Sequence, residues 1–219
     1  MTETANAAVA TTGTSVMDAA QGTGSPGRAA LLRALEELAR EQGVSNVGLR
    51  EVARHAGLSH AAPTHFFGSR DGMIRALAFE GLQLLDDELC VAQERDAQLP
   101  GRERLVSDAM EFVAFAQRHP AHFDAIFRTP SAAAGDDSLD RARRAALDGL
   151  RALVMEVHAA GDISGDVETV FLQLCTLSHG IASLAVDGLL KGFDKVPEGP
   201  NVSAEVVERI IRAQVAQLP

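Results

Sequence analysis

Residue types suited to binding nucleic acid gather between positions 50 and 70 of the sequence. Arg50 and Arg70 each carry a guanidinium group, which can hold a phosphate or form a bidentate contact with guanine. Hydroxyl and imidazole groups can reach a base edge or a phosphate, and alanine leaves room for the methyl group of thymine. For Arg50 and His60 the alternative is a solvated side chain without a partner. We expect the DNA contacts to come from Arg50, Ser59, His60, Ala61, Ala62, Thr64, His65 and Arg70.

Two short helices joined by a tight turn would place these side chains on one surface. In residues 48–67, Val52 and Ala56 recur at helical spacing, and Gly57 follows where a helix end favours a left-handed residue. Ser59 is a candidate N-cap, because its hydroxyl can accept a hydrogen bond from a free N–H of the next helix. The pattern predicts a helix-turn-helix, whose second helix enters the major groove of DNA.

Three residues of the second helix are expected to shape it rather than to contact DNA. Phe66 and Phe67 are assigned mainly to packing. Pro63 has no amide hydrogen, so in a helix that begins at His60 it should forfeit one hydrogen bond and restrict Ala62. The geometry of the recognition helix is therefore expected to be locally irregular.

Every periodic segment of the chain is helical, so we predict an all-α fold of about nine helices. The expected parts are a disordered tail, a three-helix DNA-binding bundle with a connecting fourth helix, and a larger helical domain for ligand binding and dimerisation. Their expected boundaries are 1–25, 26–85 and 86–219. The expected helices span residues 28–41, 50–56, 60–67, 71–99, 102–119, 120–127, 138–160, 166–191 and 203–218, with loops at 129–137 and 193–201.

The charge of the chain is unevenly distributed. The formal net charge is −10, yet residues 28–70 carry six arginines against four glutamates. A basic, histidine-bearing head on an acidic body fits a protein that touches phosphate with one end only. Such a protein should bind non-specific DNA modestly and with strong salt dependence.

The sequence gives no sign of export or of a membrane span. Residues 167–190 come closest to a span, but Glu168, His179 and Asp187 interrupt them. The first 27 residues lack the basic start and apolar middle of a signal peptide. The two cysteines, Cys90 and Cys175, show no metal-ligand spacing and are expected to be small buried hydrophobes. We expect a cytoplasmic protein with no metal and no cofactor.

The residues of the head resemble those of the TetR family of bacterial transcriptional regulators. The resemblance covers residues 28–78 and depends on Gly43, LREVA at 49–53, AGLS at 56–59, Phe67, and SRD at 69–71. Thr64 differs from the family, which usually has tyrosine there to hold a phosphate. The segment SHAAPTH at 59–65 resembles a branch with a WHG-type C-terminal domain, as do His119-Pro120, Phe123, Phe127 and His179-Gly180, although the chain contains no tryptophan.

The resemblance implies a homodimer on a palindromic operator, and a small hydrophobic or amphipathic effector inside each body that tilts the head through the fourth helix. The implied function is that of a ligand-responsive repressor. For the effector pocket the candidates are Met110, Phe115, Phe123, Phe127, Met155, Cys175 and His179, with ordinary core packing as the alternative. For the dimer interface, where the last two helices of each chain would pair, the candidates are Val170, Leu174, Leu177, Ile181, Val207, Ile210, Ile211 and Val215.

Two other classes of function compete with a regulator. The first is a helical ligand-binding or protein-interaction module whose head has lost DNA recognition, a reading favoured by Pro63, Thr64 and the acidic sum. The second is an enzyme, which the sequence disfavours because it contains no nucleophile–base pair, metal-ligand spacing or phosphate-binding glycine loop. No catalytic residue is therefore assigned.

Overall fold

The computed structural model describes residues 25–128, 137–192 and 204–219, and every regular element in these ranges is a helix. The predicted all-α fold is confirmed. The expected tail and both expected loops lie almost entirely outside the described residues. The elements are α1 (Pro26–Gln42), η2 (Val44–Asn46), α2 (Leu49–His55), α3 (Ala62–Phe67), α4 (Arg70–Arg95), α5 (Gly101–Arg118), α6 (Pro120–Arg128), α7 (Ser138–Ala146), α8 (Asp148–Ala159), α9 (Val167–Val186), η3 (Leu189–Gly192) and α10 (Ala204–Ala216).

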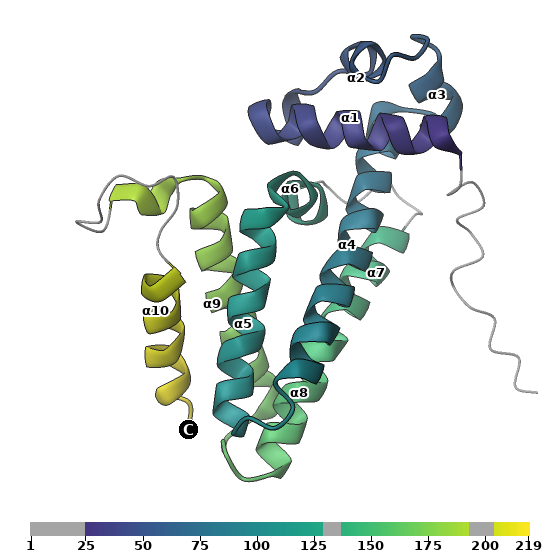
Figure 1. Ribbon diagram of the computed structural model, residues 1–219. Coiled ribbons are helices and arrows are strands. Elements are labelled where there is room, and N and C mark those ends of the chain that lie inside the picture. The colour runs from purple at the N-terminus through teal and green to yellow at the C-terminus, as the bar shows by residue number, and fades with distance from the viewer. Residues whose placement is uncertain (1–24, 129–136, 193–203) are drawn as a thin grey trace, which may run out of the picture.

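Helices α1, α2 and α3 form a head at one end of α4 (Figure 1). α1 buries its leucine face, with Leu31 and Leu35 fully enclosed. It ends at Gly43, whose φ of +79° and N–H bond of 2.8 Å to the Ala39 carbonyl close the helix. Val52 of α2 packs into the same cluster. The three-helix head predicted from the sequence is thus present.

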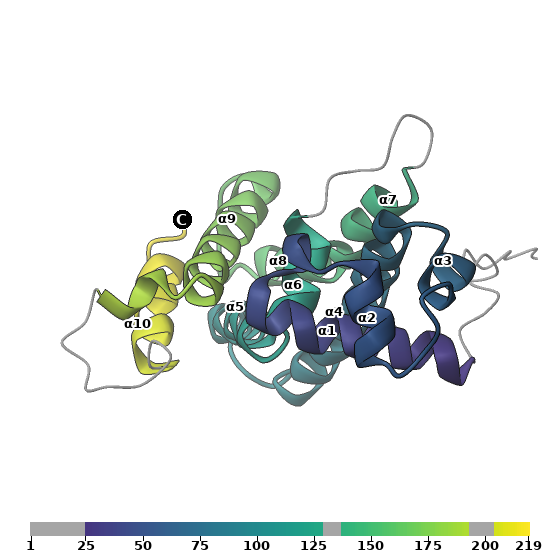
Figure 2. The same ribbon diagram turned by 90° about the horizontal axis from the view of Figure 1, so that it is seen from above.

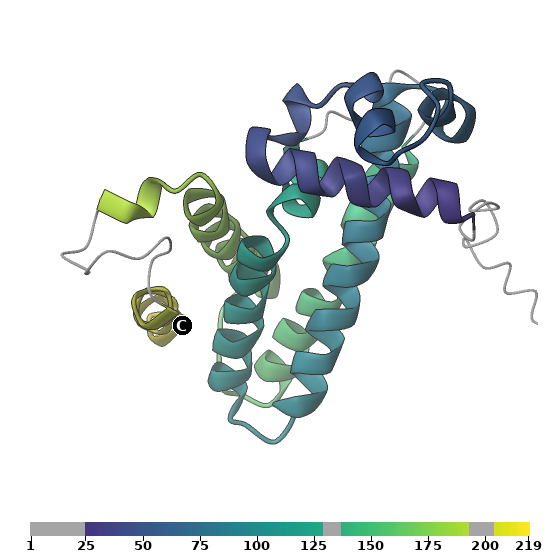
Figure 3. The same cartoon turned by 45° about the horizontal axis from the view of Figure 1, so that its top comes forward.

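α4 is the strut between the head and the body (Figures 1 and 3). The Ser69 hydroxyl caps it by accepting a hydrogen bond of 3.0 Å from the Gly72 N–H. Near this end Met73 and Leu77 complete the head core, and further along Leu85 belongs to the same cluster. Because one apolar cluster continues from the head down α4, the head is not an independently packed unit.

A second apolar cluster holds α5, α8, α9 and α10 together. Leu105 and Val113 of α5 contribute to this cluster, whereas Phe115 on the same helix faces the head-side cluster. Seen from above the head, α9 and α10 lie to one side of it (Figure 2). α5 therefore lies between the two apolar clusters and contributes side chains to both.

The segment expected to form one helix over residues 138–160 forms two, α7 and α8, with a turn at Leu147. Leu139 of α7 packs into the head-side cluster, while Leu153 and Val157 of α8 pack into the body cluster. The two halves serve different cores, which gives a physical reason for the break. It also explains why the described residues contain ten α-helices, one more than about nine.

α9 is the one helix of the described ranges that is long and apolar enough to cross a membrane by length and composition. The core helix of a soluble protein passes the same test, so the finding is weak evidence for a span. Phe171 and Leu174 are buried inside the chain, whereas Leu172 is 53% exposed and Leu184 40% exposed. α9 therefore has one face in the body core and a second apolar face at the surface.

Candidate DNA-binding head and effector region

The recognition helix α3 begins at Ala62, two residues later than expected. Its N-cap is Ala61 and no side chain caps it, so the assignment of Ser59 as N-cap is wrong. Ser59 instead accepts a 3.0 Å hydrogen bond from the Ala62 N–H through its backbone carbonyl. Because Pro63 stands in the first turn, its missing N–H removes no helical hydrogen bond, so the expected loss of a hydrogen bond is also wrong.

Most of the predicted DNA-contacting side chains lie at the surface of the head. Ala62 is half-buried, and Arg70 is considered separately below. Within the part of the chain that the structure describes, Arg50, His60 and Thr64 have no side-chain hydrogen bond or ion pair. The exposed members are Arg50, Ser59, His60, Ala61, Thr64 and His65.

The two phenylalanines at the end of α3 pack against α1, as expected. Both are half-buried in the head-side cluster. The Arg28 guanidinium lies over the Phe67 ring, 5.2 Å from its centroid, and the Phe66 ring is 3.3 Å from the position that a Cβ on Gly27 would take. This packing fixes α3 on α1 and leaves its opposite face to solvent.

Arg70 has a structural role that the sequence reading missed. Its Nε donates to the Val47 carbonyl at 2.8 Å, and its NH2 group donates to the carbonyls of Val44 and Ser45 at 3.0 and 2.6 Å. The side chain thus holds the turn between α1 and α2 against the start of α4. A phosphate contact by Arg70 stays a prediction, but most of its N–H groups already have partners.

Four aromatic rings cluster inside the body beside the α5–α6 junction. The His179 ring of α9 stacks on Phe123 with 5.5 Å between centroids and meets Phe127 edge-on at 4.8 Å. Phe112 of α5 contacts both phenylalanine rings, at 6.2 and 5.9 Å. Burial, together with the nearby Arg128, lowers the pKa of His179. Its ring is thereby kept neutral at pH 7 as a hydrogen-bonding group on an aromatic surface.

Five of the seven predicted pocket residues lie in or beside the aromatic cluster, and two lie elsewhere. Phe123, Phe127 and His179 come together in the aromatic cluster, and Met110 and Cys175 pack on the body core beside it. The other two candidates lie away from the aromatic cluster. Phe115 is buried in the head-side cluster, and Met155 is 56% exposed on the outer side of α8.

Phe112 was missed as a pocket candidate. It lies one helical turn before Phe115, so both appear on the apolar face of α5. Helical spacing alone could not decide which of the two faces the body interior.

Most residues predicted for the dimer interface are core residues of their own chain. Leu177 is half-buried, and Ile210 is 42% exposed. A shallow groove between α9 and α10 is instead lined by Thr169, Leu172, Gln173, Thr176, Leu177 and Gln214. The residues buried within the chain are Val170, Leu174, Ile181, Val207, Ile211 and Val215.

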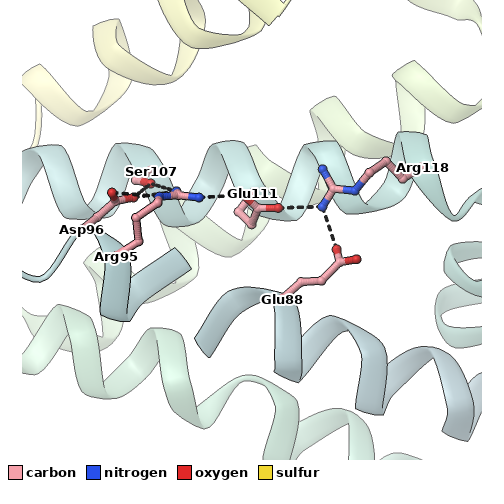
Figure 4. Close-up of polar contacts among 6 residues, drawn as sticks. All are labelled: Glu88, Arg95, Asp96, Ser107, Glu111 and Arg118. Atoms are coloured by element: carbon pink, nitrogen blue, oxygen red, sulfur yellow. Dashed lines mark hydrogen bonds and ion pairs between the residues drawn. The ribbon is translucent and has the colours of Figure 1, made fainter. Parts of the chain in front are cut away.

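Charged side chains fasten α4 to α5 along their length (Figure 4). The Arg118 NH2 group lies 2.6 Å from the carboxylates of both Glu88 on α4 and Glu111 on α5. At the other end Asp96 pairs with Arg95 at 2.7 Å and accepts a hydrogen bond from Ser107. The bond from Arg95 lowers the pKa of Asp96 to about 2. Because these ion pairs join the two helices, a displacement of α5 would also move α4 and, with it, the head.

Two family models match the chain. Residues 31–77 match the model described as bacterial regulatory proteins of the tetR family, and residues 105–213 match a tetracyclin repressor-like C-terminal domain. The matches cover the head with the first part of α4, and most of the body. No match was found among curated proteins.

Solved structures with the same fold span nearly the whole chain. A protein of unknown function from Rhodococcus sp. RHA1 is 30% identical, with a TM-score of 0.71 over 90% of this chain and 96% of that one. A tetR-family regulatory protein from Rhodococcus RHA1 has a TM-score of 0.67 at 16% identity, over 89% and 97% of the two chains. AibR, solved with isovaleryl coenzyme A and operator DNA, has a TM-score of 0.64 at 15% identity, over 88% and 97%.

Proposed function

We infer that this chain, which belongs to the TetR family of bacterial regulatory proteins, is a ligand-responsive repressor that binds a palindromic operator as a homodimer. Its family is one of transcriptional regulators rather than enzymes, and the chain carries their DNA-binding helix-turn-helix. We place it in the cytoplasm, where it meets DNA. The observation that carries the proposal is the exposed surface of α3 and of the turn before it, where His60, Thr64 and His65 face solvent, as Arg50 does on α2.

The DNA-contacting face fits the major groove in size and chemistry. A short helix held by its inner side leaves small and hydrogen-bonding side chains free to approach base edges. Arg50 would contact guanine or a phosphate, and Ala61 and Ala62 would allow close approach to thymine. The positive charge lies in the head and the negative charge in the body, so we expect phosphate contacts to be confined to the head.

The dimer is supported by apolar side chains that the chain leaves uncovered. Leu172 and Leu184 on α9 and Ile210 on α10 are each at least 40% exposed. A second copy related by a two-fold axis would cover these residues with the same residues of its own chain. It would also present two recognition helices about one turn of DNA apart, or a multiple of it, and hence require a palindromic site.

The aromatic cluster supports a small hydrophobic or amphipathic effector. AibR carries isovaleryl coenzyme A on the same fold, a molecule with both an apolar and a polar part. In this chain Phe112, Phe123 and Phe127 would contact the apolar part, and the neutral His179 ring would orient a polar group. A coupling of about 1–3 kcal/mol between this region and the head would change operator affinity roughly 5- to 150-fold.

Selection of bound sites from random DNA tests this function. Full-length protein is incubated with a random duplex library in about 0.15 M salt, and bound duplexes are amplified and sequenced over several rounds. We expect an inverted repeat to be enriched, and enrichment to disappear with the double variant Arg50→Ala, His60→Ala. A library that stays random would favour the alternative of a helical module whose head no longer reads DNA.

A further inference from the structure

One histidine is buried where the head meets the body and its ring is left without a hydrogen bond. His122 on α6 is 3% exposed, and neither of its ring nitrogens has a hydrogen-bond partner within the described residues, although a carboxylate lies within ion-pair distance of each. Buried imidazoles normally satisfy both nitrogens, because a lost hydrogen bond to water has to be replaced. A group bound between the ring and a neighbouring carboxylate would satisfy a nitrogen that the polypeptide leaves without a hydrogen bond.

The surroundings of His122 are rich in metal-binding groups. Its Nδ1 lies 3.9 Å from Glu36 Oε1 on α1, and its Nε2 lies 3.7 Å from Glu80 Oε1 on α4. Both distances are longer than a normal hydrogen bond but lie within ion-pair range. His119 joins the group, since its ring centroid is 5.9 Å from that of His122. One ligand atom from each of Glu36, His119 and His122 lies within 4.8 Å of the other two.

The close approach of α6 to α4 holds His122 in this position. A Cβ on Gly81 of α4 would lie 2.9 Å from the His122 Cβ and 3.0 Å from Ile126 Cδ1. Only glycine allows the two helices to meet this closely without a shift. The ring is thereby confined between Glu36 on one side and Glu80 on the other.

We propose that Glu36, His119 and His122 bind a divalent transition-metal cation of the zinc type, which links the head to the body. Two imidazoles and one carboxylate are a common three-ligand set for such an ion, with a fourth position left for water. At metal–ligand distances of about 2.0–2.2 Å, neighbouring ligand atoms lie about 3.3 Å apart. The ligand atoms of Glu36 and His122 would need to close by about 0.6 Å to reach that spacing, and the two pairs with His119 by at most about 1.5 Å.

The carboxylates beside the two histidines suit the same ion. With the ion on Nδ1 of His122, the Nε2–H faces the Glu80 carboxylate, and Glu88 lies 3.1 Å from Nε2 of His119. Metal-bound imidazoles commonly donate their other N–H to a carboxylate in this way. Glu36 Oε1 also accepts a 2.7 Å bond from Arg40, a half-exposed pair that the ion would have to displace or share.

Such a site would control the angle of the head. Glu36 belongs to α1, whereas His119 and His122 lie at the junction of α5 and α6. An ion bound by all three would hold α1 against α6 and favour one orientation of α3. The binding of the ion is independent of the proposed function, and only its effect on operator affinity depends on it.

Zinc binding by the full-length, metal-stripped protein tests the site directly. Zinc is titrated against a chromophoric chelator, and Co²⁺ is added separately to record the visible absorption of a protein-bound ion. We expect one ion per chain, and at least tenfold weaker binding in Glu36→Gln, His119→Gln and His122→Gln. His158→Gln is the matched control, because His158 lies at the far end of α8, where the hydrogen bond of its ring within the described residues is to the Gly165 carbonyl.

Two outcomes would overturn the site: no stoichiometric zinc, or affinity that none of the three variants changes. Glu36 is partly exposed on α1, so Glu36→Gln should fold even if His122→Gln does not, and circular dichroism checks each variant. Operator binding with and without zinc is measured separately. If zinc binds as expected but no DNA sequence is preferred, the proposed regulator fails while the metal site stands.

Discussion

The Nε atom of Arg70 donates a 2.8 Å hydrogen bond to the carbonyl oxygen of Val47, which ties the first residue of α4 to the chain just before α2. The NH2 group of the same guanidinium donates hydrogen bonds to the carbonyls of Val44 and Ser45. The planar fork of arginine matches three carbonyls of one turn that converge on it, a geometry that the single ammonium of lysine cannot reproduce. Arg70 therefore organises the head around α4.

Replacing Arg70 should lower the stability of the fold. Arg70→Ala leaves three carbonyls without their donors, and we expect a loss of about 1.5–3 kcal/mol in the free energy of unfolding. Arg70→Lys should lose nearly as much, because it keeps the charge but not the fork. Urea unfolding followed by circular dichroism measures both.

The lysine variant separates this role from a phosphate contact. If Arg70 served mainly to bind phosphate, Arg70→Lys would keep its stability and most of its DNA affinity, and Arg70→Ala would lose affinity equally for all sequences. If the turn depends on the guanidinium, both variants unfold at lower urea concentration. Wild-type stability in Arg70→Lys would contradict the assignment.

Arg50 and His60 should contribute to sequence preference rather than to folding. Both side chains are exposed, so Arg50→Ala and His60→Ala should leave the free energy of unfolding within about 0.5 kcal/mol of wild type. For a base-reading arginine, we expect the alanine variant to lose about 1–3 kcal/mol on the selected site and less on random DNA. Competitive binding by fluorescence anisotropy gives both values. Arg141→Ala, which removes an exposed arginine from α7, is the control, and equal losses on both DNAs would contradict base reading.

Asp108 should make the stability of the body depend on pH. It is buried on α5, where burial raises its pKa to about 6 although Gln93 donates a 2.6 Å hydrogen bond to it. The folded state therefore keeps a proton that the unfolded state releases near pH 4. Stability from this group is full below about pH 4 and is lost as the pH rises towards 6, by roughly 3 kcal/mol at pH 7.

Asp108→Asn should remove this pH dependence. The amide oxygen can still accept the bond from Gln93, and no charge has to be buried at pH 7. We expect the variant to gain about 1–3 kcal/mol at pH 7 and nothing at pH 4. Asp86→Asn, which neutralises an exposed carboxylate on α4, is the matched control. An equal gain at both pH values would show that burial of charge is not the cause.

The sequence predicted the helices of the head, but not the residue at which α3 begins or the contacts of Arg70. Helical spacing and the glycine at position 43 are local signals, and they placed α1, α2 and the start of α4 correctly. The start of α3 was wrong because Ser59 and Pro63 are both good helix-start residues, and only the fold decides between them. The clamp by Arg70 joins residues more than twenty positions apart, and no local pattern reveals such a contact.

The helices of the body could be predicted from the sequence, but not which of their faces are buried within the chain. α9 is apolar on more than one side, so the sequence could not tell its own core from a surface that a second chain would cover. Leu174 and Ile211 therefore entered the predicted interface, although both are buried in the chain. The cluster of Glu36 with His119 and His122 escaped notice for a related reason, because its members come from distant segments.

Charge placed on the exposed apolar face should break the proposed dimer. Leu172 and Ile210 are 53% and 42% exposed, so Leu172→Glu and Ile210→Glu leave the core intact but introduce like charges into a two-fold interface. We expect monomers at micromolar concentration by light scattering after size-exclusion chromatography. Operator affinity should fall with the loss of the second recognition helix.

The neighbouring residue Ile211 shows whether this face has been identified correctly. Ile211 is fully buried in the body cluster, so Ile211→Glu should unfold the body rather than produce a folded monomer. Leu147→Glu, at an exposed apolar position between α7 and α8, should leave both the fold and the dimer unchanged. Because residues 210 and 211 are adjacent, their contrast separates surface from core on a single turn of α10. Dimers that persist in both Leu172→Glu and Ile210→Glu would place the interface on another surface of the molecule.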